Sequence, residues 1–336
     1  MLSNIPKARI AVTRQCNMGC IYCPRGPDLS MENYDGDKYC MSNEEIIAIA
    51  ETLYGAGIRN IHLTGGEPLL RPGLVDLVAE IKKIGAVIEL NTNGLALTRE
   101  MAQDLASAGV GLLKISLDSP TEEHFRKLTK VDGYETVVTN IKTAIPILPV
   151  RLNSVVLQQN KSLIPDLIDL ADEIGAPTYH LLDLTYYPAM EYRDFWQKEF
   201  VNLTEEIAPV LADKFKEPWQ PMEIFGCNFS KIDRGDGKCV IVIKEADMSM
   251  RSTVCNDCQS YCHEGVFTLR ISAGGYLNIC PASNYMGVDA REMIQSGKAD
   301  DLKSALEGYL AIFQRARPTD SFEAFLRRNS LSLTGA

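Results

Sequence analysis

The sequence predicts an α/β fold in which a parallel sheet closes into part of a barrel, followed by a smaller C-terminal α+β module. Two observations lead to this prediction. Short β-branched runs alternate with longer amphipathic stretches up to about residue 190, and beyond that point the alternation stops. Six consecutive β/α units joined by right-handed crossovers form a parallel sheet with the helices outside it.

The expected strands are short and rich in β-branched residues, and they cover residues 9–13, 60–64, 87–91, 112–117, 150–157 and 178–184. The expected helices have apolar residues at helical spacing, and they cover residues 43–54, 74–84, 99–108, 134–145 and 162–174. Ser42 and Thr98 stand directly before two of these helices. Both are good N-cap residues, because a side-chain oxygen can accept a hydrogen bond from an unpaired N–H of the first turn.

The second half of the chain has a different pattern. It contains Pro218 and Pro221, a glycine-rich turn at residues 234–237, and short strand-like runs at 240–244 and 267–272. We therefore divide the chain into a barrel domain, residues 1–190, and a C-terminal domain, residues 191–336.

Composition narrows the class of protein. The chain has 336 residues, 46% of them hydrophobic, without a continuous apolar run long enough for a transmembrane helix. The first ten residues lack the apolar stretch of a signal peptide, so we expect a cytoplasmic protein. In a reducing compartment its ten cysteines are expected to bind metal rather than to form disulfides. The net charge of −10 argues against nucleic acid or an anionic membrane as a partner.

Three cysteines near the N-terminus form the most specific motif. Cys16, Cys20 and Cys23 are separated by three and two residues, and Tyr22 precedes the last of them. Three thiolates at this spacing can ligate three irons of a [4Fe–4S] cluster and leave the fourth iron open for another ligand. A zinc knuckle, which usually has Cys-x2-Cys pairs, and unrelated buried thiols are the alternatives.

A second motif follows the second expected strand. Gly65 and Gly66 let the backbone approach a ligand closely, Glu67 offers an acceptor for an amino group, and Pro68 stiffens the exit. In a barrel, ligands bind at the carboxyl ends of the strands, which is where this motif lies. An ordinary strand-to-helix turn is the alternative.

Polar side chains also follow the third and fourth expected strands. Thr92 and Asn93 end one and Ser116 ends the other, offering hydroxyl and amide groups suited to a carboxylate or a ribose. Capping of the next helix is the alternative reading of all three.

Together these motifs resemble those of radical S-adenosylmethionine (SAM) enzymes, and in particular the GTP 3′,8-cyclase family of molybdenum cofactor biosynthesis. The resemblance is carried by residues 9–24, 64–71, 91–94, 116–119 and 151–158. It implies a partial (β/α)6 TIM-type barrel that binds a [4Fe–4S] cluster through Cys16, Cys20 and Cys23. It also implies that SAM binds across the strand ends, near Tyr22 and the second motif.

The resemblance extends to a second cysteine cluster but is imperfect there. The family has three ligands in a Cys-x2-Cys-x13-Cys pattern, whereas this chain has Cys255, Cys258, Cys262 and Cys280. Four cysteines resemble the twitch domains of radical SAM enzymes that act on sugars and aminocyclitols. They imply a second [4Fe–4S] cluster that is fully ligated and could transfer an electron but not bind substrate through iron.

Candidate substrate contacts differ from the family as well. Arg71, Arg151 and Arg270 fall where the family has cationic substrate contacts, but His180 and Thr268 replace two arginines. A triphosphate needs several Lys or Arg donors. We therefore expect a less charged small molecule such as a nucleoside, a monophosphate or a sugar derivative. Alternatively, Arg71 and Arg151 lie at the surface or form ion pairs within the protein.

The activity implied by the resemblance is reductive cleavage of SAM to a 5′-deoxyadenosyl radical, which abstracts hydrogen from the substrate and leads to oxidation, rearrangement or C–C cleavage. An external donor such as flavodoxin or ferredoxin would supply the electron. We take Asp183, after the sixth strand, and Arg270 as candidate catalytic residues.

GTP 3′,8-cyclase and a peptide-modifying radical SAM enzyme remain the alternatives, and a peptide substrate is disfavoured because few residues precede Cys16. An electron carrier would not need the second motif.

Three further cysteines have no close partner in the sequence. Cys40, Cys227 and Cys239 are best explained as small buried hydrophobic residues, with ligation of a third cluster as the less favoured alternative.

Overall fold

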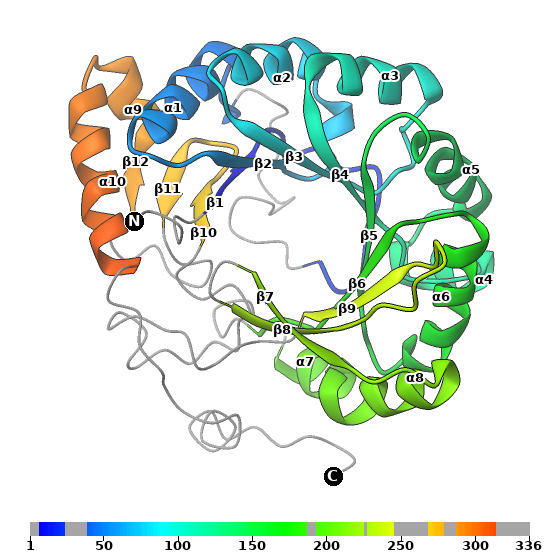
Figure 1. Cartoon of the computed structure of the whole chain (residues 1–336). Helices are drawn as coiled ribbons and strands as arrows, with labels where there is room; N and C mark the ends of the chain where they lie inside the picture. Colours follow the sequence, from blue (N-terminus) through cyan, green and yellow to red (C-terminus); the bar gives the residue numbers. More distant parts are fainter. Residues whose placement is uncertain are drawn as a thin grey trace.

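The computed structural model describes residues 7–23, 39–186, 193–224, 227–244, 268–278 and 287–313. In this part of the chain the strands form one twelve-stranded sheet in the order β12-β11-β10-β1-β2-β3-β4-β5-β6-β9-β8-β7. The sheet curves into an open barrel with helices on its outer side (Figure 1).

The centre of the sheet is parallel. Its strands are β1 (Lys7–Ala11), β2 (Asn60–Thr64), β3 (Val87–Thr92), β4 (Val110–Ser116), β5 (Val150–Val155) and β6 (Thr178–Leu182). β10 (Thr268–Ile271) pairs parallel with β1 at one side, and β9 (Val240–Lys244) pairs parallel with β6 at the other. The first half of the chain therefore builds the parallel sheet that the sequence predicts, and strands of the second half extend it at both sides.

Antiparallel strands complete both edges of the sheet. β11 (Tyr276–Asn278) and β12 (Val288–Asp289) follow β10, while β8 (Cys227–Ile232) and β7 (Gln220–Ile224) follow β9. Lys244, at the end of β9, and Thr268, at the start of β10, thus belong to opposite sides of the open barrel.

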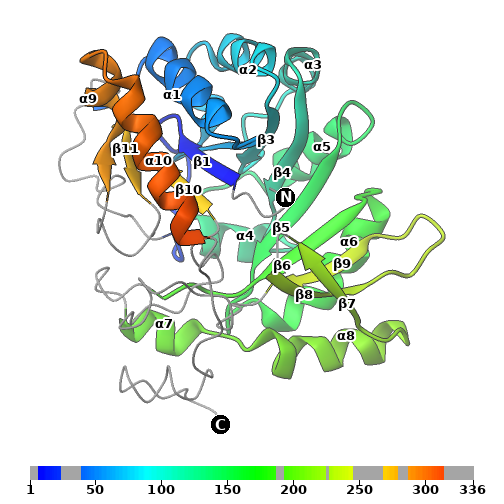
Figure 2. The ribbon, with the colours of Figure 1, turned by 60° about the vertical axis from the view of Figure 1, so that its left-hand side comes forward.

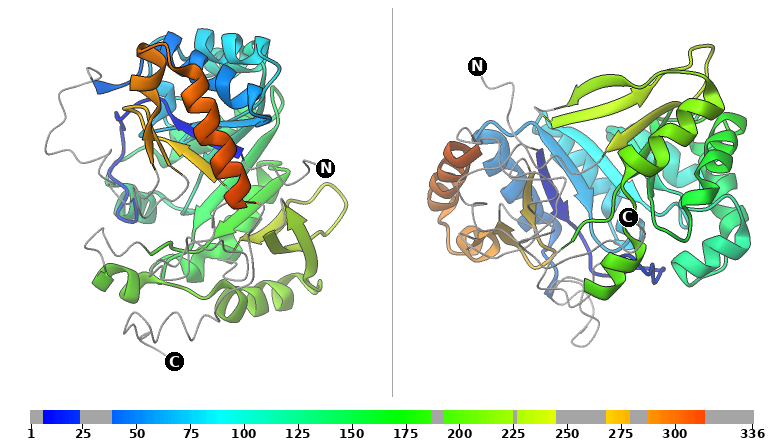
Figure 3. Two further views of the ribbon diagram at one scale, coloured as in Figure 1. Left: turned by 90° about the vertical axis from the view of Figure 1, so that its left-hand side faces the viewer. Right: turned by 90° about the horizontal axis from the view of Figure 1, so that it is seen from below.

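The helices lie outside the sheet. The longer ones are α1 (Asn43–Gly55), α2 (Leu74–Lys83), α3 (Arg99–Ala108), α4 (Glu122–Thr129), α5 (Tyr134–Ala144), α6 (Ile164–Glu173), α7 (Arg193–Glu199), α8 (Ala208–Phe215), α9 (Ala290–Gln295) and α10 (Ala299–Phe313). Short turns of other helix types are η3 (Pro68–Leu70), η4 (Lys161–Leu163) and η6 (Leu203–Ile207). α9 and α10 pack beside α1 (Figure 2), and α8 lies at the opposite side of the molecule from α10 (Figure 3).

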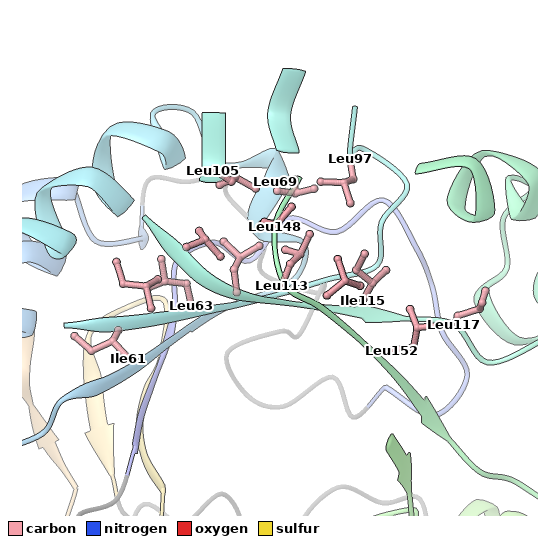
Figure 4. Packing of buried hydrophobic residues seen from close by; sticks show 14 of the residues in the cluster. Ile61, Leu63, Leu69, Leu97, Leu105, Leu113, Ile115, Leu117, Leu148 and Leu152 are labelled. Atoms are coloured by element: carbon pink, nitrogen blue, oxygen red, sulfur yellow. The ribbon is translucent and has the colours of Figure 1, made fainter. Parts of the chain in front are cut away.

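The hydrophobic core lies between the sheet and the helices. Strand residues such as Ile61, Leu63, Leu113 and Leu152 are fully buried and point to the helix side, where they meet residues such as Leu105 (Figure 4). Burying one such side chain stabilises the fold by about 1.5–3 kcal/mol. The opposite, inner face of the strands is therefore free to carry polar residues without breaking the core.

Several expected elements are confirmed in detail. Strand 60–64 and helix 99–108 have the expected bounds, and Ser42 and Thr98 accept hydrogen bonds from Glu45 N and Met101 N as N-caps. The helix expected at 162–174 begins instead at Ile164, after the 3-10 turn η4, because Pro165 fits only the first turn of an α-helix. α4, which the sequence analysis does not anticipate, is capped by Thr121.

No helix in the described ranges combines the length and the apolar character needed to cross a membrane.

Candidate active site

The loop that carries the three N-terminal cysteines follows β1 and is fixed by α4. The backbone N–H of Gly19 donates to the carbonyl of Thr129 (2.8 Å), and that of Ile21 donates to the carbonyl of Leu128 (2.9 Å). These carbonyls lie at the C-terminal end of α4, where helix carbonyls lack intrahelical partners. The unanticipated helix therefore holds the cysteine loop against the barrel.

Tyr22 makes a second connection. Its hydroxyl donates to Oδ2 of Asp118, just after β4, and Oδ1 of the same carboxylate accepts from the backbone N–H of Val155 (2.8 Å). The ring of Tyr22 packs against a buried cluster that contains Leu128 and Trp196. The tyrosine between Cys20 and Cys23 is thus tied to the ends of β4 and β5.

The Gly-Gly turn after β2 docks directly onto the cysteine loop. Gly66 N–H donates to the carbonyl of Thr13 (2.9 Å), and Glu67 N–H donates to that of Gln15 (2.6 Å). A Cβ atom on Gly66 would overlap the backbone of Gln15, and one on Gly65, whose φ is +150°, would lie 2.5 Å from the carbonyl oxygen of Thr13. Both glycines are required by this close approach of two backbones.

The Glu67 carboxylate connects this turn to the end of β3. It accepts hydrogen bonds from Leu69 N (3.0 Å), from the hydroxyl of Thr92 (2.7 Å) and from Asn93 N (2.7 Å). Burial raises the pKa of Glu67, while these three hydrogen bonds act in the opposite direction. Pro68 begins η3 directly afterwards. The structure therefore brings Gly65, Gly66, Glu67, Thr92 and Asn93 together, and Glu67 organises them.

Asn93 also reaches the cysteine loop, because its side-chain amide donates to Oδ1 of Asn17 (2.7 Å). Asn17 is the neighbour of Cys16. The ends of β1, β2, β3 and β4 therefore meet at one place at the mouth of the barrel.

Cys16, Cys20 and Cys23 are thiols at this mouth. Burial, followed by the charges of Asp118, Cys23 and Cys16, raises the pKa of Cys20 to about 12. The thiolate form that iron requires is thus favoured only once metal binds. In the ranges that the structure describes, no three His, Cys, Asp or Glu side chains stand close enough to hold a single metal ion, but the thiols that ligate a four-iron cluster each bind a different iron and need not converge on one point. Their number, type and shared loop fit a three-cysteine iron–sulfur site.

Beneath the mouth, charged side chains occupy the inner face of the strands. Glu89 on β3 forms an ion pair with Lys114 on β4, and its carboxylate lies 2.5 Å from Nε2 of the neutral His62 on β2. Arg151 on β5 lies beside Lys114 in register and is half-buried. Burial, followed by the positive charge of Arg151, lowers the pKa of Lys114 to about 7.

Comparison with known proteins identifies the family. Residues 10–171 match the model of the radical SAM superfamily. A probable GTP 3′,8-cyclase of Saccharolobus islandicus is 36% identical over 306 residues, covering 89% of this chain and 90% of the relative. The chain belongs to the radical SAM superfamily. A probable GTP 3′,8-cyclase of Pyrococcus horikoshii is 32% identical and covers 93% of both chains.

Solved structures agree on the fold of this radical SAM protein. The crystal structure of Streptococcus suis SuiB bound to its precursor peptide SuiA superposes with a TM-score of 0.63 at 14% identity, covering 99% of this chain and 72% of that one. Native anSMEcpe with bound AdoMet gives a TM-score of 0.55 at 13% identity, covering 82% of this chain and 74% of that one.

The candidate substrate residues of the radical SAM barrel fall into two groups. Arg151 and His180 lie on the inner face, where Asn153 pairs in register with His180 and Nε of Arg151 donates to Oδ1 of Asn153 (3.2 Å). The guanidinium of Arg71, in contrast, donates to the carbonyls of Val12 and Met41 and to the side chain of Asn43. Arg71 thus fastens the start of α1 to the end of β1.

The remaining candidates lie on other strands. Ser116 ends β4 and pairs in register with Asn153, next to the mouth. Asp183 is buried directly after β6. Arg270 on β10 pairs in register with Arg9 of β1, which places it at the side of the barrel opposite β6.

Cys255, Cys258, Cys262 and Cys280, together with the C-terminal residues, lie outside the described residues. Cys40 and Cys239 are buried, as expected, Cys239 within the hydrophobic core, and Cys227 belongs to β8.

Sequence reasoning missed His62 and Lys114, which form a buried cluster with Glu89. A local signal existed, because each is a charged or titratable residue that alternates with buried aliphatic residues in its strand. What the sequence could not give was the register that brings the three strands together.

Proposed function

We propose that the protein is a radical SAM enzyme that abstracts hydrogen from a small anionic molecule, such as a nucleotide or a sugar phosphate, held inside the barrel. The observation that carries this proposal is the cation Arg151, which lies beside Lys114 on the inner face of the strands beneath the SAM motifs. Cations enclosed in a barrel attract an anionic ligand because the surroundings screen their charge weakly.

Each part of the mouth has a distinct role in this proposal. Cys16, Cys20 and Cys23 would hold the cluster, which supplies with bound SAM the radical chemistry. The turn at Gly65 and Gly66, which docks on the backbone of the cysteine loop, would lie beside the methionine part of SAM. Thr92, Asn93 and Ser116 would contact its carboxylate and ribose. The barrel wall would position the target carbon and exclude water.

GTP 3′,8-cyclase is the second candidate, favoured by relatives of that name at 36% and 32% identity. The inner face argues for a less charged substrate than a triphosphate. Burial, followed by the charges of Arg151, Lys244, Lys114 and Lys7, lowers the pKa of His180 to about 2. A neutral His180 adds no positive charge where the resembling family has arginine.

We also propose that Cys255, Cys258, Cys262 and Cys280 ligate a second [4Fe–4S] cluster that accepts or transfers an electron. An external donor such as flavodoxin or ferredoxin would reduce the N-terminal cluster, in the reducing cytoplasm. Asp183 and Arg270 remain proposed as catalytic residues. The fate of the substrate radical, whether oxidation, rearrangement or C–C cleavage, would depend on this second cluster.

The test is anaerobic incubation of the reconstituted protein with SAM, dithionite and one compound at a time from a panel of GTP, ribonucleoside monophosphates, nucleosides and sugar phosphates. Mass spectrometry then follows 5′-deoxyadenosine and new products. We expect a monophosphate or sugar phosphate to stimulate 5′-deoxyadenosine formation more than the matching uncharged compound. Stimulation by GTP with a cyclised product would establish the second candidate instead, and 5′-deoxyadenosine formation with none of the panel would contradict both.

A further inference from the structure

Three titratable side chains outside the iron–sulfur and SAM motifs form a buried cluster, and they are His62, Glu89 and Lys114. Its members come from three neighbouring strands. The side chains of His62 and Lys114 are 2% and 4% exposed, and that of Glu89 is 19% exposed. Burying three titratable groups is costly unless they satisfy one another, and a pocket of such groups is more common at functional sites than elsewhere.

The contacts within the cluster favour one arrangement of the protons. Nε2 of His62 lies 2.5 Å from the Glu89 carboxylate, and Nδ1 lies 3.0 Å from Nζ of Lys114. With the proton on Nε2, His62 donates to Glu89 and its Nδ1 accepts from Lys114. Burial lowers the pKa of His62 to about 3, so the ring is neutral and can play this double role.

Lys114 then uses two of its three N–H groups on Glu89 and His62. Among the described residues, the third has no protein partner. Lys114 lies two residues before Ser116 on the same face of β4, about 7 Å further into the barrel than the strand end at the SAM motifs. A small molecule enclosed between SAM and the barrel interior would lie within reach of this amine.

We propose that Lys114, held between Glu89 and His62, exchanges a proton with the substrate and takes it from a hydroxyl or amine next to the carbon that loses hydrogen. This inference rests on the proposed function. In the step, the O–H or N–H bond of the substrate breaks and its electron pair stays on the heteroatom. The lone pair of neutral Lys114 forms the new N–H bond, so only a proton passes from the substrate to the protein. The ammonium that results is stabilised by Glu89.

The charges around Lys114 suit this role. Burial is the main cause that brings its pKa to about 7, and the positive charges of Arg151 on β5 and Arg9 on β1 act in the same direction. Glu89 on β3 acts against them, while neutral His62 on β2 accepts a hydrogen bond. Both protonation states of Lys114 are therefore populated near neutral pH, which is the condition for efficient proton transfer in both directions.

The first test needs no substrate. The reconstituted full-length protein is labelled with acetic anhydride at a series of pH values, and the labelling of each lysine is measured on its peptide by mass spectrometry. We expect the labelling of Lys114 to rise with a midpoint near pH 7, whereas lysine in model peptides titrates near pH 10. Glu89→Gln should lower the midpoint of Lys114, and Arg151→Gln should raise it. A midpoint for Lys114 equal to the model-peptide value, or no labelling at any pH, would overturn the inference.

The second test measures turnover with the panel compound that stimulates 5′-deoxyadenosine formation. Lys114→Met should keep SAM affinity but lower the ratio of product to 5′-deoxyadenosine about 100-fold and remove the pH dependence of that ratio near 7. Lys83→Arg on the surface is the control, and circular dichroism checks that both variants fold. An unchanged ratio of product to 5′-deoxyadenosine in Lys114→Met would reject proton exchange while leaving the proposed function intact.

Discussion

The hydroxyl of Tyr22 donates a hydrogen bond to the buried carboxylate of Asp118, which lies 96 residues further along the chain. Tyr22 stands in the middle of the cysteine loop, and Asp118 follows the end of β4. This hydrogen bond makes the position of the cysteines depend on a strand that lies far along the sequence.

Replacing Tyr22 by phenylalanine should therefore weaken the cysteine loop. The carboxylate of Asp118 would keep the N–H of Val155 but lose its charge-assisted partner, at a cost of about 1.5–3 kcal/mol in unfolding free energy. Urea denaturation and iron content after reconstitution measure the effect. Tyr134→Phe is the matched control, since no described residue bonds to the Tyr134 hydroxyl; equal losses in the two variants would refute the role of Tyr22.

Gly66→Ala should disrupt the docking of the Gly-Gly turn on the cysteine loop. The added Cβ would overlap the backbone of Gln15, and backbone atoms cannot move aside as a flexible side chain can. We expect a loss of roughly 1–3 kcal/mol in stability and no detectable SAM cleavage. At Gly111 on β4 the nearest atom to an added Cβ is 3.4 Å away, so Gly111→Ala should fold and cleave SAM normally. Normal SAM cleavage by Gly66→Ala would show that the two segments need not touch.

Glu67→Gln tests whether the carboxylate serves SAM directly or through the protein. Glutamine keeps the shape but can no longer accept hydrogen bonds with both terminal atoms, so the bonds from Leu69, Thr92 and Asn93 cannot all persist. We expect SAM affinity, measured by calorimetry, to fall by about 1.5–3 kcal/mol. Thr92→Val, which removes one donor to the same carboxylate, should weaken SAM binding in the same direction. If neither variant changed SAM affinity, the turn would have only a structural role.

The ion pair between Asp172 on α6 and Arg234 before β9 predicts a pH dependence of stability. Burial would raise the pKa of Asp172, but hydrogen bonds from Arg234 (2.7 and 2.8 Å) and Cys239 N (2.9 Å) outweigh it and lower the pKa. A lowered carboxyl pKa in the folded state stabilises the fold above the ordinary value of about 3.9, and this stability is lost as the pH falls below it.

We therefore expect Asp172→Asn to lose about 1.5–3 kcal/mol at pH 7 and progressively less than that below pH 4, by urea denaturation. The matched control is Asp213→Asn, since Asp213 forms an exposed pair with Lys216 and should contribute little at any pH. A constant difference between wild type and Asp172→Asn across this range would contradict the linkage.

Iron content tests both cysteine groups. After anaerobic reconstitution we expect about eight iron and eight sulfide per chain, as two four-iron clusters require. Replacing Cys16, Cys20 and Cys23 together by alanine should remove about half of the iron and abolish 5′-deoxyadenosine formation. Cys262→Ala alone should instead lower the iron of the second cluster and leave SAM cleavage intact. Cys239→Ala, at a buried position, should leave the iron content unchanged.

The sequence was sufficient for the parallel sheet and its SAM motifs because both depend on local pattern. Apolar runs give β2 and α3 their bounds, and cysteine spacing and adjacent glycines are visible within a few residues. α4 is only eight residues long, and its capping residue Thr121 follows Ser119 and Pro120, which indicate a turn. Its importance to the cysteine loop could not be predicted, because it rests on two carbonyls rather than on any side chain.

Arg71 and Lys114 show the second limit of sequence reasoning. Arg71 stands beside the SAM motif, yet its guanidinium binds the backbone of Val12 and Met41. Lys114 has no motif around it. In register it stands opposite Asn91 on β3, and it meets Glu89, which stands opposite Leu112, diagonally. The register between strands depends on the packing of the whole sheet, so it cannot be predicted from the residues adjacent in the sequence.

The two hydrogen bonds from Gly19 and Ile21 to the end of α4 also have a consequence for biosynthesis of the mature protein. The cysteines leave the ribosome early, but their partners Leu128 and Thr129 are translated more than a hundred residues later. Until then the loop has neither the backbone bonds nor the tyrosine anchor that shape it. We therefore expect iron–sulfur delivery to act on a chain whose first four strands have folded, and a nascent N-terminal fragment to be a poor acceptor of the cluster.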